Sequence, residues 1–281
     1  MNDRVRAGLP ADLDDGLDAA GRIRREGDLG RVPDAFRPLV GRVDLALREA
    51  FGNRLHSSYL YGSVPRGTAI VGRSDLDVSV VLDDQPTTGD RRTAAEIAAE
   101  LADRAVADEI GIVIDSRADI LSDHQRYDEA FHISCLCTPL WGPDLAEELP
   151  DHYPTRDLAA GIGRAAPAAF ERLGRLLHDQ TQARPDLVRQ RVGRRIARHA
   201  FASVLHRWPG WTSDPDVLVR VVTAFHPDRA EELALAVRLG WGRLQGRPPT
   251  GPDDHEQAVQ LLAGAGWWLT EHRRATSGVR S

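Results

Sequence analysis

Apolar residues in the first half of the chain change from helical spacing to alternation and back again. Between Phe36 and Phe51 they recur every three or four positions, which predicts an amphipathic helix that Gly52 and Asn53 end. The runs that follow predict a strand, a second strand, a helix and a third strand, at residues 55–61, 75–82, 91–108 and 111–115. Elements in this order indicate an α/β or α+β domain that ends near Pro150.

Beyond residue 150 the pattern is helical almost throughout. Apolar residues rise in steps of four from Val188 to Val204, and Pro209 with Gly210 ends that helix. The fold class that we predict is α+β, with a first domain of a small mixed sheet and helices followed by an all-helical domain. Four parts are predicted: an N-terminal extension with short helices around 11–26, a sheet-containing domain, a helical domain and a tail. They span residues 1–33, 34–150, 151–275 and 276–281, respectively.

The composition is that of a globular protein. The chain of 281 residues is 42% hydrophobic and 28% charged. No stretch approaches the roughly 20 apolar residues that span a bilayer, and the start lacks a secretory pattern, so we expect a cytoplasmic protein. The net charge of −6 argues against nucleic acid as a partner. Because the sequence contains no lysine, any basic side chain that contacts a phosphate must be an arginine or a histidine.

Alternation along residues 75–82 places two carboxylates on one side of a strand. Asp75 and Asp77 share a face with Ser79 and Val81, whereas the opposite face is wholly apolar and must pack against helices: Leu76, Val78, Val80 and Leu82. Two carboxylates this close repel each other, and a divalent cation between them removes the conflict. Oxygen ligands suit Mg²⁺, which shares its coordination shell with substrate phosphates, and two such ions can assist phosphoryl transfer.

A glycine-rich loop precedes this strand, and its small residues are Gly62, Ser63, Gly67 and Gly72. Glycines let backbone N–H groups approach phosphate oxygens, and the serine hydroxyl adds a donor. Arg66 and Arg73 can supply positive charge to a leaving pyrophosphate. A triphosphate cradle and a metal-binding carboxylate pair are therefore predicted in one short segment.

These residues resemble the signature of the DNA polymerase β-like nucleotidyltransferase superfamily. A Gly-Ser pair, a spacer and Asp-Leu-Asp between apolar residues match over residues 59–82, and the likeness weakens toward residue 143. The resemblance implies that Asp75 and Asp77 are metal ligands, and that the nucleotide-binding residues are Gly62, Ser63, Arg66, Gly67 and Ser74. It also implies two Mg²⁺ ions and a nucleoside triphosphate as donor, with ATP the expected one.

The same superfamily carries a third carboxylate on a later strand. Asp115, which closes Gly-Ile-Val-Ile-Asp, is the candidate in this sequence, and Asp119 is the reserve. By resemblance, Asp115 holds the catalytic metal and takes the proton from the attacking hydroxyl. The implied catalytic and metal-binding set is Asp75, Asp77 and Asp115. Without a third carboxylate, the domain would be a nucleotide-binding module with no enzymatic activity.

A transferase domain followed by a helical domain resembles the layout of aminoglycoside and other antibiotic nucleotidyltransferases. The resemblance implies transfer of a nucleoside monophosphate, AMP, to a hydroxyl of a small molecule such as an aminoglycoside-type antibiotic, with release of pyrophosphate and a role in antibiotic resistance. A polycationic acceptor would call for acidic side chains in the second half, where the candidates are Glu171, Asp179, Asp186, Asp214 and Asp216.

Two alternatives stay open. One is a protein-modifying nucleotidyltransferase of toxin–antitoxin type. The other is a transferase fused to a helical ribonuclease-like module, for which Arg194 and His199 fit a loose Arg-x(4–6)-His pattern.

Three further groups of residues have plainer interpretations. Cys135 and Cys137 are interpreted as small apolar fillers, because no matching cysteine or histidine pair flanks them. Most of the tryptophans are expected in the core or at a domain interface, among them Trp208, Trp211, Trp267 and Trp268. A run of arginines is interpreted as a solvated helix face: Arg189, Arg191, Arg194, Arg195 and Arg198.

Overall fold

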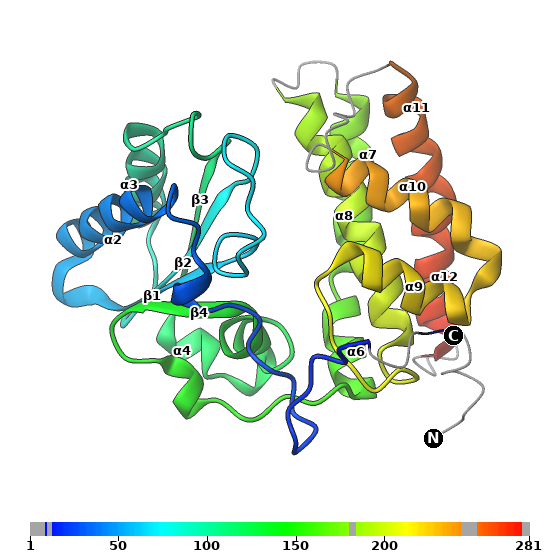
Figure 1. Cartoon of the computed structure of the whole chain (residues 1–281), viewed down its shortest axis with the longest axis horizontal. Helices are drawn as coiled ribbons and strands as arrows, with labels where there is room; N and C mark the ends of the chain where they lie inside the picture. The colour runs from blue at the N-terminus through cyan, green and yellow to red at the C-terminus, as the bar shows by residue number, and fades with distance from the viewer. Residues whose placement is uncertain (1–8, 10–12, 180–183, 243–251, 277–281) are drawn as a thin grey trace. The chain divides into compact units, whose positions relative to one another are not determined.

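The computed structural model describes residues 9, 13–179, 184–242 and 252–276 (Figure 1). Residues 277–281 of the predicted tail lie outside this part of the chain. The chain forms two compact units, one made of Ile23–His152 and the other of Met1–Arg22 with Tyr153–Ser281. The unit that contains the sheet thus begins at Ile23, within the segment that the sequence assigns to an extension.

The first unit contains a four-stranded sheet with strand order β3-β2-β1-β4. Its strands are β1 (Leu55–Tyr61), β2 (Leu76–Leu82), β3 (Ile110–Ser116) and β4 (Cys137–Trp141). β1 is antiparallel to β2 and to β4, whereas β2 and β3 are parallel, so the sheet is mixed. Together with the helices this arrangement confirms the α+β class.

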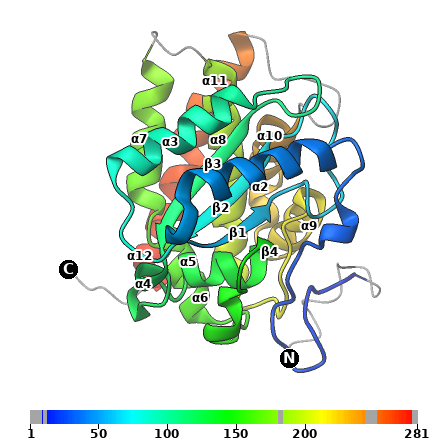
Figure 2. The same cartoon turned by 90° about the vertical axis from the view of Figure 1, so that its left-hand side faces the viewer.

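Two helices cover one face of the sheet, α2 (Arg37–Phe51) and α3 (Thr88–Glu100), as Figure 2 shows. The apolar face of β2 packs against them in one large core, which confirms the predicted alternation: Leu76, Val78, Val80 and Leu82 are all completely buried. A smaller core lies on the opposite face and includes Tyr59, Val81 and Cys137. Asp75 and Asp77 are on this second face, because residues alternate along the strand.

The second face also carries short helical segments between β3 and β4. These are α4 (Arg117–Ile120), the 3-10 turn Asp123–Gln125, α5 (Glu129–Phe131) and a π-type turn, His132–Leu136. Further 3-10 turns span Leu29–Arg31, Gly52–Arg54 and Leu145–Glu148. Ile120 and Ile133 anchor α4 and the π-type turn in the smaller core.

α3 starts earlier and ends earlier than its sequence pattern predicts. It begins at Thr88 because Thr87 and Asp90 form a capping box, in which each side chain accepts a hydrogen bond from the other residue's backbone N–H. It ends at Glu100, and the chain then turns around Asp103, whose backbone oxygen accepts from the N–H groups of Val106 and Ala107. The apolar spacing beyond residue 100 therefore belongs to a turn that packs on the core.

Two regions differ from the sequence prediction in kind. The strand β4 was not predicted, and its middle residue is Pro139. Residues 13–26 contain bends and isolated bridges, so the short helices expected there are absent from the described part of that segment.

The second unit is helical, as predicted. Its helices are α6 (Arg156–Gly163), α7 (Ala166–His178), α8 (Pro185–Val204), α9 (Pro215–Phe225), α10 (Ala230–Trp241), α11 (Pro252–Leu261) and α12 (Trp267–Thr276), with a π-type turn at Leu262–Gly266. α8 packs against each of the other helices and forms the centre of the unit. It approaches α10 closely at Gly193, where an added Cβ would lie 2.3 Å from the backbone oxygen of Ala236. Within the described residues, no helix is both long and apolar enough to span a membrane.

Candidate active site

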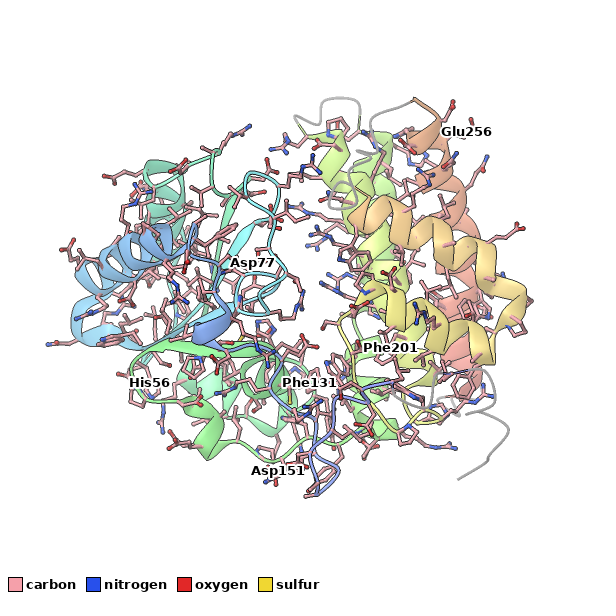
Figure 3. All side chains as sticks on the ribbon, in the orientation of Figure 1. His56, Asp77, Phe131, Asp151, Phe201 and Glu256 are labelled. Atoms are coloured by element: carbon pink, nitrogen blue, oxygen red, sulfur yellow. The ribbon has the colours of Figure 1, made fainter. Side chains whose placement is uncertain are left out.

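The two carboxylates of the sequence motif project from the start of β2. Asp75 directly precedes the strand and Asp77 is its second residue, and both side chains are half-buried. Leu76 and Val78 are locked in the large core, so the strand cannot rotate to turn the carboxylates inward. Figure 3 shows Asp77 on the side of the sheet away from α2 and α3.

Asp77 lies between two glycines, one within β3 and one directly after β1. It pairs with Gly111 of β3, and an added Cβ there would lie 3.2 Å from its Oδ1 atom. An added Cβ at Gly62, directly after β1, would lie 2.7 Å from its Oδ2 atom, which is closer than real contacts allow. The glycines therefore create the space that the Asp77 carboxylate occupies.

The glycine-rich loop forms a tight turn directly after β1. Gly62 and Gly67 have φ values of 80° and 75°, a conformation that residues with a side chain rarely adopt. The turn is closed by backbone hydrogen bonds from Gly67 N–H to the oxygen of Val64 (3.1 Å) and from Thr68 N–H to the oxygen of Ser63 (3.0 Å). Val64 is completely buried, so the turn is anchored to the core next to Asp77.

The other residues of the motif have identifiable contacts within the chain. The hydroxyl of Ser74 is buried and accepts a hydrogen bond from the N–H of Ile70 (2.9 Å), which closes the loop before β2. Arg66 donates from Nη1 to the Oε2 atom of Glu26 (3.1 Å). Ser74 thus shapes the loop, while Arg66 is an ion-paired side chain on the glycine turn.

Asp115 lies near the other end of β3. In the parallel register Asp77 is opposite Gly111, whereas Asp115 is opposite Val81, four residues further along. Burial raises the pKa of Asp115, and Arg91 lowers it in part. Glu129 lies near Asp115, and burial together with the charge of Asp115 raises its pKa to about 7. The structure therefore groups Asp115 with Glu129 of α5 and not with Asp75 and Asp77. The reserve candidate, Asp119, is on α4.

A different carboxylate lies beside Asp75. Leu76 is opposite Ile110, and the N–H of Leu76 donates to the backbone oxygen of Glu109, so the register extended by one residue puts Glu109 next to Asp75. Glu109 is exposed and, by alternation, is on the same face as Asp75 and Gly111. The sequence prediction missed it because it began the third strand at Gly111 and looked for a carboxylate at the strand's far end.

The carboxylate oxygens at the start of β2 are of the kind that binds a hard divalent cation. Asp75 and Asp77 offer carboxylate oxygens from one strand end, which are the ligands that Mg²⁺ prefers. Among the described residues, no three histidine, cysteine, aspartate or glutamate side chains are grouped closely enough to hold a metal ion by themselves. A cation here would thus take two protein carboxylates and complete its shell with phosphate oxygens and water, which is how Mg²⁺ is commonly bound.

Two secondary predictions, for the cysteines and for the arginine run, have clear outcomes. Cys135 and Cys137 are buried thiols, and burial raises the pKa of Cys135 to about 12, as expected of apolar fillers. Of the five arginines in α8, Arg191 and Arg198 are exposed, but Arg189 is buried and Arg194 donates to the backbone oxygen of Gly240 (2.9 Å). The run is therefore not a single solvated face, because half-buried arginines also pack within the unit.

The predictions for the tryptophans and for His199 have different outcomes. Trp208 is buried, whereas Trp267 is 66% exposed and so is not a core residue. His199 is buried and packs edge-on against Phe170, with ring centroids 5.5 Å apart. A histidine buried in this way is not displayed to an RNA strand, which disfavours the ribonuclease alternative.

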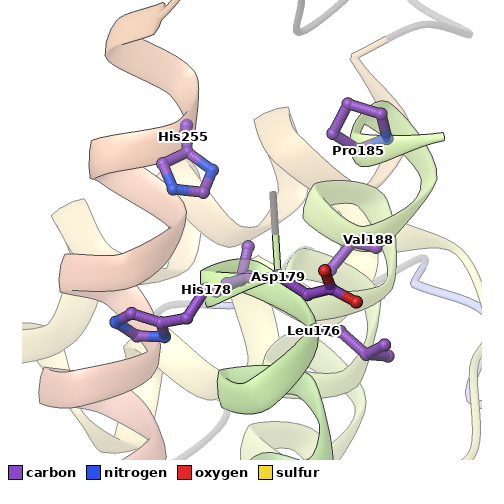
Figure 4. Close-up of a pocket in the computed structure, with 7 residues that line it drawn as sticks. Leu176, His178, Asp179, Pro185, Val188 and His255 are labelled. Carbon is purple, nitrogen blue, oxygen red and sulfur yellow. The ribbon is translucent and has the colours of Figure 1, made fainter. Parts of the chain in front are cut away.

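The predicted acceptor-binding acids are used in different ways. The Asp214 carboxylate caps α9 by accepting from the N–H groups of Asp216 and Val217. Asp186 pairs with Arg184 at 3.2 Å. Asp179 lines a cavity of about 250 Å³ at the ends of α7 and α8, with His178 and His255 at its edge (Figure 4). Because residues 180–183 lie outside the described chain, we assign this cavity no ligand.

The fold has a counterpart among solved structures. One such structure is spectinomycin adenyltransferase AAD(9) from Enterococcus faecialis, determined with ATP and spectinomycin. The match covers 83% of this chain and 99% of that one, with a TM-score of 0.53 and 15% sequence identity, and at this identity it establishes the fold. No protein-family model and no curated protein sequence matches the chain.

Proposed function

We propose that the chain is a metal-dependent nucleotidyltransferase that moves AMP from ATP to a hydroxyl of a small molecule, an aminoglycoside-type antibiotic, and releases pyrophosphate. The observation that carries this proposal is the position of Asp77, whose carboxylate lies between Gly62 and Gly111 beside the glycine turn. The likeness to an adenyltransferase solved with ATP and spectinomycin supports the donor and the acceptor class.

In this proposal each group has a distinct task. Asp75 and Asp77 would hold Mg²⁺, which supplies positive charge to the triphosphate. The glycine turn presents backbone N–H groups to the phosphates at a point where no side chain blocks their approach. Arg66 adds a guanidinium on the same turn, which binds phosphate oxygens by charge-assisted hydrogen bonds.

We assign the third carboxylate to Glu109 in place of Asp115. Glu109 is opposite Asp75 in the extended register and is exposed to an incoming acceptor, whereas Asp115 is near the other end of the strand. A carboxylate in this position can accept the proton that the attacking hydroxyl loses. Asp115 is the alternative, and separate substitution of the two carboxylates distinguishes them.

The direct test is a transfer assay with a panel of acceptors. The purified protein is incubated with Mg²⁺, labelled ATP and individual drugs that include spectinomycin and other aminoglycosides, and the nucleotidylated drug and pyrophosphate are measured together. We expect product with at least one drug, and its loss in Asp77→Asn. The matched control is Asp83→Asn, an exposed aspartate just beyond the far end of β2.

The possible failures of this assay are distinct. Bound ATP with no product for any drug would reject the acceptor class and leave the transferase assignment in place. Full activity in Asp77→Asn would reject the site itself.

A further inference from the structure

Residues 23–31, which we call the N-terminal strap, connect the β4 side of the sheet-containing unit to the glycine turn. The N–H of Ile23 donates to the oxygen of His152 (2.8 Å), and the N–H of Glu26 donates to that of Cys135 (2.9 Å). The N–H of Asp28 then donates to the oxygen of Pro65 within the glycine turn (2.9 Å). The strap is therefore part of the wall of the proposed donor site.

Glycines allow the strap and the turn to approach closely. An added Cβ at Gly27 would lie 2.9 Å from the Cβ atom of Pro65, and one at Gly67 would lie 3.0 Å from the backbone oxygen of Arg31. The backbones touch on both sides of Arg66, so a change in the strap reaches this arginine directly.

The side chain of Glu26 is the strap's charged contact with the turn. Its Oε2 atom accepts from Nη1 of Arg66 at 3.1 Å, and the side chain is only 10% exposed, compared with 26% for that of Arg66. A guanidinium has five N–H donors in one plane, so a single bond to Glu26 fixes its position and leaves other donors for an anion.

A carboxylate this close to the glycine turn is unfavourable for the binding of a triphosphate. A triphosphate on the glycine turn would be repelled by Glu26 if the charge were not neutralised. The pairing with Arg66 neutralises it and restricts a side chain that otherwise loses much rotational freedom when it binds phosphate. The arrangement favours donor binding only if the two residues act as one unit.

We propose that Glu26 is a positioning residue that holds the Arg66 guanidinium in the orientation that binds the donor triphosphate. The inference rests on the proposed function, since it needs a triphosphate on the glycine turn. It assigns a role at the active site to a segment before the nucleotidyltransferase motif.

The test is a double-mutant cycle in the full-length protein, with the KM for ATP and the dissociation constant of Mg²⁺–ATP as readouts. Glu26→Gln should raise both about tenfold and leave kcat within about twofold, because each tenfold step corresponds to about 1.4 kcal/mol of lost binding. Arg66→Ala should raise them about a hundredfold, because it removes both the guanidinium that binds the phosphates and the positive charge closest to the Glu26 Oε2 atom. The double variant Glu26→Gln/Arg66→Ala should bind ATP better than Arg66→Ala alone.

The control is the neighbouring ion pair of the strap. Arg25 donates to Asp144 through two hydrogen bonds of 2.7 and 3.1 Å, so Asp144→Asn weakens the strap without touching the glycine turn. Asp144→Asn should lower the thermal midpoint and leave the KM for ATP unchanged. Glu26→Asp keeps the charge but shortens the side chain, and an intermediate rise in KM is expected there even if Glu26→Gln does not fold.

The outcomes separate this inference from the proposed function. If the wild type binds no Mg²⁺–ATP, both fail. If the wild type transfers AMP and the Glu26 variants change only the thermal midpoint, the strap is structural and the positioning role is rejected. Effects of Glu26→Gln and Arg66→Ala that simply multiply in the double variant would also reject it, because the two residues would then act independently.

Discussion

Replacement of Glu109 by glutamine distinguishes the two candidates for the third carboxylate. Asp115 follows Gly111, the partner of Asp77, by four residues, and a strand rises about 3.3 Å per residue, so Asp115 is about 13 Å away along the sheet. Glu109 is opposite Asp75 on the adjacent strand, at a spacing of about 4.8 Å. An aspartate side chain cannot cover the larger distance, whereas the two neighbouring carboxylates can face one substrate.

The expected effects therefore differ by orders of magnitude. Loss of a general base lowers kcat roughly 10²- to 10⁴-fold, and this is what we expect for Glu109→Gln, with ATP binding largely kept. Asp115→Asn should keep kcat within about threefold, since it removes no group near the phosphates. The assay is steady-state pyrophosphate release with ATP and whichever drug the acceptor panel identifies.

Stability measurements supply a second, independent readout. Because burial raises the pKa of Asp115, its ionised form is disfavoured in the folded state, and Asp115→Asn should not lower the thermal midpoint at pH 8. Glu100→Gln, an exposed glutamate at the end of α3, controls for nonspecific effects of the amide. If Asp115→Asn abolished transfer while Glu109→Gln stayed active, the register argument would be refuted and the assignment made from the sequence would stand.

Three further predictions follow from single contacts. Gly62→Ala should lower kcat/KM about tenfold or more, because the added Cβ displaces the Asp77 carboxylate. Gly21 has a similar φ (79°), but an added Cβ there has no atom within 4 Å, so Gly21→Ala should leave kcat/KM unchanged. Equal activities of the two variants would contradict the proposed triphosphate cradle. Thr87→Ala should lower the free energy of unfolding by about 1 kcal/mol through loss of the α3 cap, measured in urea, and an unchanged urea midpoint would show that the cap contributes nothing. Glu129 has a pKa raised from 4.5 to about 7, so the folded state loses stability as pH rises from 4.5 to 7. Glu129→Gln should therefore be more stable than wild type at pH 8, by about 1–2 kcal/mol after allowance for partial exposure. Below pH 4.5 the two proteins should differ little in stability. A stability difference that does not change with pH would reject the raised pKa of Glu129.

Local patterns in the sequence predicted the parts of the site that local geometry determines. The alternation in β2 identifies which side chains are buried, because a strand with one wholly apolar face has only one way to pack. Asp75 and Asp77 follow from that alternation without any knowledge of the neighbouring strands. The glycine turn is also local, because its left-handed residues are glycines in the sequence itself.

Contacts between distant segments could not be read in this way. β4 contains Pro139, which argues against a strand, but β4 is at the edge of the sheet, where the missing N–H breaks no interior ladder. The strap has no periodicity because it is held by backbone hydrogen bonds to residues that are far away in the sequence, such as those from Ile23 and Glu26. Neither feature leaves a signal in a window of neighbouring residues.

The pairing register of β2 with β3 decides which carboxylate in or directly before β3 lies beside the Asp75 and Asp77 pair. Glu109 and Asp115 are on the same face of the sheet, since they are six positions apart and side chains alternate along a strand. Periodicity cannot choose between them. The choice depends on which residue of β3 is opposite Asp77, and Gly111 occupies that place because any side chain there would press on the Asp77 carboxylate. The same steric constraint that makes room for Asp77 therefore places Glu109 beside Asp75, so the glycine in β3 identifies the end of the strand at which the chemistry is expected.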